Sequence, residues 1–242
     1  MKFTGKTAMV TGAAIGIGMA AAECFAKNGA DIVMTDINEE GLKAHAAHLE
    51  ETYGVRVFAK ACDVSDEDAV RAFVREALSV FGKIDILVNN AALWRRFMPF
   101  TDTTSDMWKT FININILGTM YCTHAVLPGM LENGWGRIIN VASVAGVYGN
   151  ANMADYSMTK GAVISFTKAL AKEVSAKGVT VNAISPGSVS NHQDVIEPSE
   201  LAFMGRTGTH TENAEMICYL AGDEAAYISG QNIQIDGCRR KM

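Results

Sequence analysis

The chain has 242 residues, of which 49% are hydrophobic and 19% charged, and its formal net charge is −5. A length of this order suits one sizeable domain, and the composition excludes an intrinsically disordered tail. The acidic balance argues against nucleic-acid binding and against binding to an anionic membrane surface. The apolar run at the N-terminus breaks at Gly12, unlike a signal peptide, and no apolar run is long enough to predict a membrane span.

The five cysteines are scattered along the chain, and no two have the spacing of a metal-binding pair. This pattern predicts reduced thiols in a cytoplasmic protein with no metal site. His45 and His48 lie three residues apart in a polar predicted helix, which indicates a solvated face.

Short β-branched runs alternate with longer amphipathic segments along the whole chain. The predicted strands are Thr7–Thr11, Asp31–Thr35, 56–61, 84–89, 137–142, 180–184 and Asn232–Ile235. The predicted helices are 16–28, Glu39–Tyr53, 66–81, 105–131, 154–176 and 211–221. This order predicts a single α/β domain over residues 1–242, with a Rossmann-type, doubly wound parallel sheet flanked by helices on both faces. Ser65 is the predicted cap of the third helix, and residues 188–210 are the predicted substrate loop or lid.

A glycine-rich turn joins the first predicted strand to the first predicted helix. Glycine allows positive φ and a close approach of the backbone to a diphosphate, and the helix directs its free N–H groups at that charge. Glycines also serve ordinary tight turns, but the position between strand and helix favours dinucleotide binding. The candidate cofactor-binding residues of this turn are Gly12, Ile15, Gly16, Ile17 and Gly18.

Asp36 ends the second predicted strand, where a carboxylate can bind the adenosine ribose hydroxyls and repel a 2′-phosphate. Ala13, Ala14 and Ile37 occupy the positions where a group pairing with that phosphate would stand, so NAD is the predicted cofactor. Asp36 could also cap the next helix.

Asp63 and Val64 follow the third predicted strand. They are candidates for holding the adenine edge. A plain turn aspartate is the alternative for Asp63.

Tyr156 and Lys160 lie four residues apart in a predicted helix, so both side chains share one face. A nearby ammonium lowers the pKa of a tyrosine, and a shift from about 10 to about 7 needs roughly 4 kcal/mol. Ser143 follows the fifth predicted strand, at the edge of the sheet where open α/β folds bind ligands. The Tyr-x-x-x-Lys pair alone is a common chance match, and the order and spacing of the set give it meaning.

With these residues in place, the chain resembles the short-chain dehydrogenase/reductase family over essentially its whole length. The motifs that carry the resemblance are residues 11–18, Asp63-Val64, Asn89-Asn90-Ala91-Ala92, Asn115, Ser143, Tyr156-x-x-x-Lys160 and Asn182-x-x-x-Pro186-Gly187. Ala92 and Asn191 depart from the residues usual in the family, and the segment between Gly187 and Arg206 is shorter than usual. The short segment predicts an open or shallow substrate pocket.

The resemblance implies that Tyr156 exchanges a proton with the substrate oxygen and that Ser143 hydrogen-bonds the same oxygen. It implies that Lys160 lowers the pKa of Tyr156 and holds the nicotinamide ribose, and that Asn115 holds a water that relays protons from Lys160. The further cofactor contacts that it implies are Asn90, Ala91, Pro186, Gly187 and Val189.

The predicted function is NAD-dependent interconversion of a secondary alcohol and a ketone, with a hydroxysteroid or another bulky alicyclic alcohol as the favoured substrate. A 3-oxoacyl-thioester reductase is the alternative, against which Asp36 argues because the reductases it resembles generally use NADPH. A non-catalytic dinucleotide sensor is the competing function from another class. Arg95 and Arg96 follow the fourth predicted strand, where a surface loop is the favoured interpretation and binding of a substrate carboxylate or phosphate is the alternative. The basic C-terminus, residues 239–241, is by default a solvated tail, with a place in a subunit interface as the alternative that the resemblance offers. The resemblance also implies that the long apolar helices 105–131 and 154–176 pair across a two-fold axis in a homotetramer or homodimer.

Overall fold

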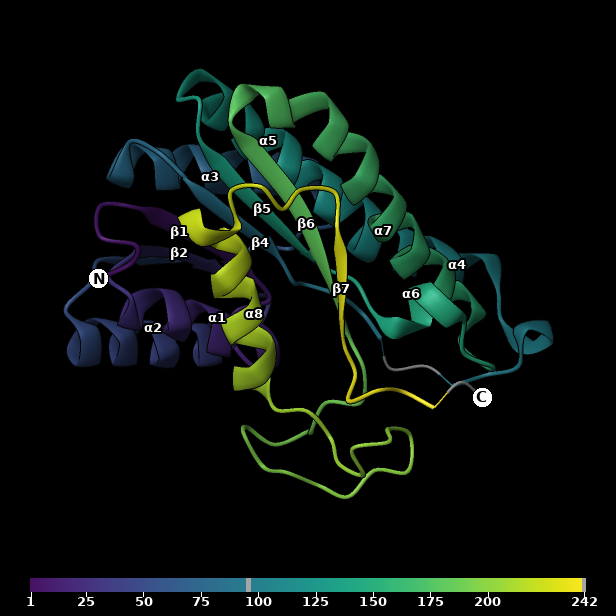
Figure 1. Ribbon diagram of the computed structural model, residues 1–242. Helices are drawn as coiled ribbons and strands as arrows, with labels where there is room; N and C mark the ends of the chain where they lie inside the picture. Colours follow the sequence, from purple (N-terminus) through teal and green to yellow (C-terminus); the bar gives the residue numbers. More distant parts are fainter. Residues whose placement is uncertain (95–96, 241–242) are drawn as a thin grey trace.

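The computed structural model describes residues 1–94 and 97–240 and shows one seven-stranded sheet covered by helices on both faces (Figure 1). The strands are β1 (Thr7–Thr11), β2 (Asp31–Thr35), β3 (Val57–Ala59), β4 (Ile86–Asn89), β5 (Gly136–Val141), β6 (Val179–Pro186) and β7 (Asn232–Ile235). The α-helices are α1 (Gly16–Lys27), α2 (Glu39–Tyr53), α3 (Glu67–Phe81), α4 (Ser105–Phe111), α5 (Gly118–Glu132), α6 (Val144–Tyr148), α7 (Ala154–Val174) and α8 (His210–Ala221). The shorter helices are η1 (Phe100–Asp102), η2 (Ile112–Leu117), η3 (Ser175–Lys177) and η4 (Asp223–Ala225).

The strand order is β3-β2-β1-β4-β5-β6-β7, and every neighbouring pair is parallel. The chain builds outward from β1 to β3 and then returns to place β4 against the other side of β1. The strand order therefore reverses between β1 and β4, and doubly wound folds bind ligands at the carboxyl ends of the strands at such a switch point. The predicted fold class is confirmed.

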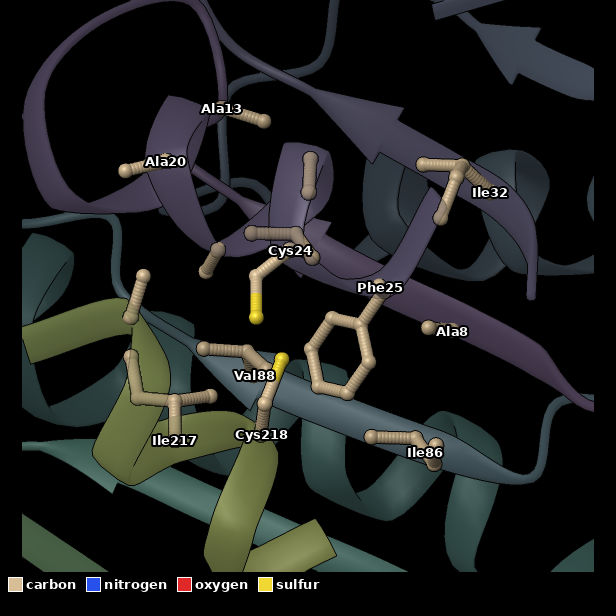
Figure 2. Close-up of a cluster of buried hydrophobic side chains, with 14 of the residues drawn as sticks. Ala8, Ala13, Ala20, Cys24, Phe25, Ile32, Ile86, Val88, Ile217 and Cys218 are labelled. Atoms are coloured by element: carbon tan, nitrogen blue, oxygen red, sulfur yellow. The ribbon is translucent and has the colours of Figure 1, made fainter. Parts of the chain in front are cut away.

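Alternate residues of each strand feed two hydrophobic cores. Ala8 and Val10 of β1 join the core beneath α1, α2 and α8, while Met9 between them joins the core beneath α3, α5 and α7. Figure 2 shows part of the first core, with Cys24 of α1 and Cys218 of α8 pointing toward one another beside Val88 of β4. All five cysteines are free thiols. Among the described residues no helix is long and apolar enough to cross a membrane.

Several predicted bounds differ from the structure; for example, β3 is shorter (Val57–Ala59 rather than 56–61) and β6 is longer (Val179–Pro186 rather than 180–184). Three other differences concern helices. The predicted third helix begins one residue later, because Asp66 rather than Ser65 accepts the capping hydrogen bond, from the N–H of Ala69 (3.0 Å). The predicted helix 105–131 is interrupted by the π-helical segment η2. The short helix α6, which starts directly after Ser143, was not predicted.

The loop between β6 and α8 extends from the carboxyl edge of the sheet, at the foot of Figure 1. Isolated bridges pair Val189 with Gly208 and Pro198 with Arg206, so the loop folds back on itself. A capping box then starts α8: Thr209 and Glu212 each accept a hydrogen bond from the other's backbone N–H. The predicted lid therefore has a definite conformation over most of its length.

Candidate active site

The glycine-rich turn after β1 is closed to side chains on its inner side and open on its outer side. Gly12 has φ +64°, and a Cβ there would lie 2.8 Å from the Cα of Ala91. A Cβ on Gly18 would overlap the carbonyl oxygen of Gly12. Gly16 also has positive φ, but a Cβ on it would meet no atom within 4 Å. Gly12 and Gly18 therefore permit close backbone packing, whereas Gly16 permits a positive φ beside open space, as a diphosphate cradle requires.

The start of α1 lacks a side-chain cap. Its N-cap residue, Ile15, makes no side-chain hydrogen bond to the helix, and the first turn contains no acidic residue. The free N–H groups and the positive end of the helix dipole are therefore left to bind an anion. Ile15 is exposed, whereas Ile17 packs against the core.

Asn90 locks this turn to the carboxyl end of β4. Its side-chain amide donates to the carbonyl oxygens of Thr11 (3.0 Å) and Gly12 (2.9 Å). The hydroxyl of Thr11 in turn accepts from the backbone N–H groups of Asn90 and Ala91, both at 3.0 Å. The cradle and the strand switch point are thereby held as one unit. This role of Thr11 was not predicted, and its position as the last residue of β1 is the only signal for it in the sequence.

Asp36 lies beside the cradle and supports it. Its carboxylate accepts hydrogen bonds from the N–H of Ala14 (3.1 Å) and of Asn38 (2.9 Å). The cap of α2 is Asn38, which accepts from the N–H of Gly41 (3.1 Å), so Asp36 does not cap this helix. Ile37 is 78% exposed and brings no charge to this edge. The Asp36 carboxylate therefore lies next to the turn, and positions 14 and 37 carry uncharged side chains.

Asp63 forms a turn, and Val64 packs behind it. The Asp63 carboxylate accepts from the backbone N–H (2.9 Å) and hydroxyl (2.7 Å) of Ser65. Val64 is buried and packs against Gly118, where an added Cβ would lie 2.8 Å from the Val64 Cγ2. The turn alternative is thus seen for Asp63, and its contact with adenine stays a prediction.

His45 is buried, so the prediction of a solvated side chain is wrong for this residue. Its Nδ1 lies 3.3 Å from the carbonyl oxygen of Ala13, which places the ring behind the cradle turn. Burial lowers the pKa of His45. His48 is exposed, as predicted. Among the described residues no group of three or more His, Cys, Asp or Glu side chains is arranged to hold a metal ion.

Ser143 and Tyr156 meet at the carboxyl edge of the sheet. Ser143 is the N-cap of α6, and its Oγ accepts from the N–H of Ala145 (3.1 Å). The Ser143 hydroxyl is near enough to the phenol of Tyr156, on α7, to lower the pKa of that tyrosine. The Tyr156 ring also meets Phe111 edge-on, with ring centroids 6.3 Å apart. Helix α6 therefore fixes the direction of the serine hydroxyl, and Phe111 fixes the plane of the phenol.

Lys160 lies one turn along α7 and is 97% shielded from solvent, with 3% exposed. Its Nζ donates to the carbonyl oxygen of Val141 (2.7 Å) and lies 5.9 Å from the centroid of the Tyr156 ring. Burial lowers the pKa of Lys160 to about 8. Tyr156 and Lys160 thus lie on one face of α7, as predicted. The Lys160 ammonium, however, donates its hydrogen bond to a backbone oxygen and not to the Tyr156 hydroxyl.

Burial raises the pKa of Tyr156, and the hydrogen bond with Ser143 lowers it by less. The spacing from Lys160 predicted a lowered pKa for Tyr156. The protein residues alone raise it instead. The physical reason is that desolvation of the phenolate outweighs its one stabilising hydrogen bond. The protein by itself holds Tyr156 as a neutral phenol, ready to donate a proton.

Asn115 lies in the π-helical segment η2 and is 1% exposed. Its side-chain amide pairs with the backbone of Leu93, accepting from the N–H (2.8 Å) and donating to the carbonyl oxygen (2.9 Å). It also donates to the hydroxyl of Thr159 (3.1 Å), which donates to the carbonyl oxygen of Tyr156 (2.8 Å). Asn115 therefore links the segment after β4 to the turn of α7 that carries Tyr156. Its participation in a proton relay stays a prediction.

The remaining predicted residues lie along the end of β6. Pro186 is the last residue of this strand, and a Cβ on Gly187 would lie 2.8 Å from the Cα of Asp236. Val189, two residues after Gly187, forms the bridge to Gly208. The contacts predicted for Arg95 and Arg96 lie outside the described residues. Asn191 is exposed in the loop.

Comparison with known proteins agrees with this geometry. The family model described as enoyl-(acyl carrier protein) reductase matches residues 12–238. The 2-dehydro-3-deoxy-L-rhamnonate dehydrogenase (NAD(+)) of Sphingomonas sp. (strain SKA58) is 36% identical, over 98% of this chain and 96% of its own. The chain belongs to the short-chain dehydrogenase/reductase family.

Two further members of this family illustrate its range. The 3-oxoacyl-[acyl-carrier-protein] reductase of Thermotoga maritima is 36% identical, with 98% of both chains covered. The crystal structure of an NAD+-bound xylitol dehydrogenase matches with a TM-score of 0.92 and 34% identity, over 98% of this chain and all of that one. The relatives are oxidoreductases by name, and membership of this family makes the protein an oxidoreductase.

Proposed function

We propose that this protein interconverts a secondary alcohol and a ketone by hydride transfer, with NAD(H) as its cofactor. The observation that carries the proposal is the joining of three parts at one sheet edge. These are the glycine cradle with its uncapped helix, the carboxylate of Asp36 beside it, and the group of Ser143, Tyr156 and buried Lys160.

The cofactor is held, in this proposal, by Gly12, Gly16, Gly18, Asp36 and Lys160. The open space beside Gly16, at the uncapped start of α1, supports this assignment. When bound, NAD+ supplies a hydride acceptor for the carbinol carbon of an alcohol. Residues Ile15, Ile17, Asp63, Val64, Asn90, Ala91, Pro186, Gly187 and Val189 complete the predicted contacts.

The chain's own residues handle the proton. Tyr156 donates its phenolic proton to the carbonyl oxygen during reduction and takes it back during oxidation. Ser143 donates a hydrogen bond to the same oxygen and stabilises the negative charge that develops there. The Lys160 ammonium and the positive charge of an oxidised nicotinamide favour the phenolate during oxidation, which offsets the burial that raises the pKa of Tyr156.

NAD(H) is favoured over NADP(H) because the Asp36 carboxylate would repel a 2′-phosphate. The relatives named as rhamnonate and xylitol dehydrogenases carry NAD+ in their names. The similarity to 3-oxoacyl-thioester reductases keeps that activity as the alternative. A non-catalytic dinucleotide sensor has less support, since a sensor has no need of a proton donor held against a serine.

For the substrate, a hydroxysteroid or another bulky alicyclic alcohol follows from the short loop after Gly187. The names of the two NAD+ relatives favour a second class, polyhydroxylated alcohols and sugar acids. We further propose a cytoplasmic protein that assembles as a homotetramer or homodimer. The apolar surface shared by α5 and α7, which includes Met120 and Phe166, supports assembly.

A cofactor and substrate screen tests the proposal. The ratio kcat/KM is measured with NAD+ and with NADP+ for sterols, sugar alcohols, sugar acids and hydroxyacyl thioesters. We expect turnover of a secondary alcohol with a clear preference for NAD+. Preference for NADP+ together with turnover of hydroxyacyl thioesters alone would favour the reductase alternative.

A further inference from the structure

The last described residues run along the substrate loop. The N–H groups of Phe203 and Met204 donate to the carbonyl oxygens of Cys238 (2.9 Å) and Gly237 (3.1 Å). An antiparallel bridge pairs Ala202 with Arg239. In Figure 1 this segment leaves β7 and runs below the carboxyl edge of the sheet toward α6. The backbone of Arg239 is therefore paired with the substrate loop at Ala202.

The side chain of Arg239 reaches the loop between α6 and α7. Its Nη2 lies 3.4 Å from the side-chain oxygen of Asn150, in the loop between α6 and α7. The N–H of Asn150 donates to the hydroxyl of Ser157 (3.2 Å), the neighbour of Tyr156. The guanidinium therefore lies against the loop that leads into the catalytic turn.

The charge of Arg239 is not balanced by a described carboxylate. Among the described arginines, Arg137 is buried, Arg206 and Arg239 are half-buried, and the others are exposed. Arg137 pairs with Asp223 and Arg206 pairs with Glu212. Within residues 1–94 and 97–240, the partner of the Arg239 guanidinium is a neutral amide oxygen, and no Asp or Glu lies within ion-pair distance of it.

The neighbouring charge has a different role. The Arg240 guanidinium stacks over the ring of Phe203, 4.9 Å from its centroid, and the side chain is exposed. Arg240 is therefore a suitable control for Arg239, because it carries the same charge but is exposed and stacks on Phe203. Arg239 has five N–H donors in a planar fork suited to a carboxylate, and its partner Asn150 occupies only part of them.

We infer that Arg239 binds a carboxylate of the substrate, so that the preferred substrate is a hydroxy acid. The inference rests on the proposed function, because it assigns the far end of the alcohol that Tyr156 and Ser143 act on. A bidentate pair with Arg239 fixes the orientation of the acid relative to Tyr156. The geometry leaves the carbon skeleton open, since both a sugar acid and a steroid acid carry this group.

Binding of matched acids and neutral compounds to the protein saturated with NADH tests the inference by titration calorimetry. The pairs are gluconate with sorbitol, and cholate with its methyl ester. We expect one acid to bind and its neutral partner to bind at least about tenfold more weakly. Arg239→Gln removes this preference and leaves the weaker neutral binding unchanged, while Arg240→Gln keeps it. The pair that shows the preference identifies the skeleton.

Three results would overturn the inference: no binding of either acid, equal binding of acid and neutral partner, or an equal effect of Arg239→Gln on both. Unchanged NADH binding and melting temperature in Arg239→Gln distinguish a lost subsite from a damaged fold. Turnover with NAD+ is measured in parallel. Acid binding that depends on Arg239 without turnover supports the subsite and counts against the proposed function, whereas failure to bind NADH contradicts the proposed function alone.

Discussion

The backbone of Gly146 lies directly against the backbone of Lys160. A Cβ on Gly146 would lie 2.5 Å from the Lys160 carbonyl carbon, closer than real side chains allow. Helix α6, which starts at the cap residue Ser143, is thereby held against α7, which carries Tyr156. The contact sets the separation of the serine hydroxyl and the phenol.

Gly146→Ala should therefore damage catalysis more than folding. Forcing α6 away from α7 costs about 1–3 kcal/mol in packing, and a displacement of about 1 Å at the reacting groups can lower kcat about 100-fold. The measurements are kcat for alcohol oxidation and the free energy of unfolding in urea. Gly129→Ala is the control, because a Cβ there meets no atom within 4 Å. Full kcat in Gly146→Ala would show that this contact does not position Ser143.

Asp36→Asn should weaken the preference for NAD+. The substitution keeps an oxygen that can accept from Ala14 and removes the charge that repels a 2′-phosphate. Since juxtaposed like charges cost several kcal/mol, we expect the ratio of kcat/KM for NAD+ to that for NADP+ to fall at least about tenfold. Asp68→Asn, at an exposed position on α3, is the control for the change in net charge. An unchanged ratio would remove Asp36 from cofactor selection.

Lys160 should make stability depend on pH in the alkaline range. Burial lowers its pKa in the folded chain to about 8, from the ordinary lysine value of 10.5. Below pH 8 both folded and unfolded chains bind the proton, so the cost of burying the charge is constant. Between these two values the unfolded chain binds more protons, and stability rises with pH.

The expected result is that the free energy of unfolding of the wild type rises relative to Lys160→Met, by at most about 3 kcal/mol, over that window. Urea unfolding at several pH values measures it. Lys172→Met, an exposed lysine on the same helix, should show no such change relative to the wild type. A flat or falling difference for Lys160→Met would contradict the burial of a charged ammonium.

Asn115→Ala should destabilise the protein because it leaves both backbone groups of Leu93 without their partners. Unsatisfied buried polar groups cost about 1–3 kcal/mol each, so we expect the two groups together to lower the free energy of unfolding by about 2–6 kcal/mol. Asn133→Ala, at the exposed end of α5, is the matched control and should have little effect. Equal stability of the two variants would mean that Asn115 is not a structural brace.

The strands could be predicted because each is a short apolar run buried on both faces, and β1, β2 and β7 have the predicted bounds. The glycine turn, Ser143, Tyr156 and Lys160 are recognisable from residue type and order. Helix α6 escaped prediction because it has five residues and contains Gly146. The π-helical turn at Asn115 leaves no mark on an apolar helical pattern.

Other features depend on contacts between distant segments. The bond from Lys160 to Val141, the position of His45 behind Ala13, and the pairing of Arg239 with Ala202 join residues that no local pattern relates. The pKa of Tyr156 also depends on burial, which the four-residue spacing does not reveal. Local sequence therefore identifies the proposed catalytic groups, whereas the folded chain determines their electrostatics and the segments that surround them.

Tyr156→Phe tests the central proposal most directly, because it removes only the oxygen that exchanges the proton. We expect kcat for NAD+-dependent oxidation of the best alcohol in the screen to fall by about 10²–10⁴-fold. NADH binding should be retained, and Tyr227→Phe, at a fully exposed tyrosine, should keep full activity. Wild-type turnover in Tyr156→Phe would contradict the assignment of this tyrosine as the acid/base.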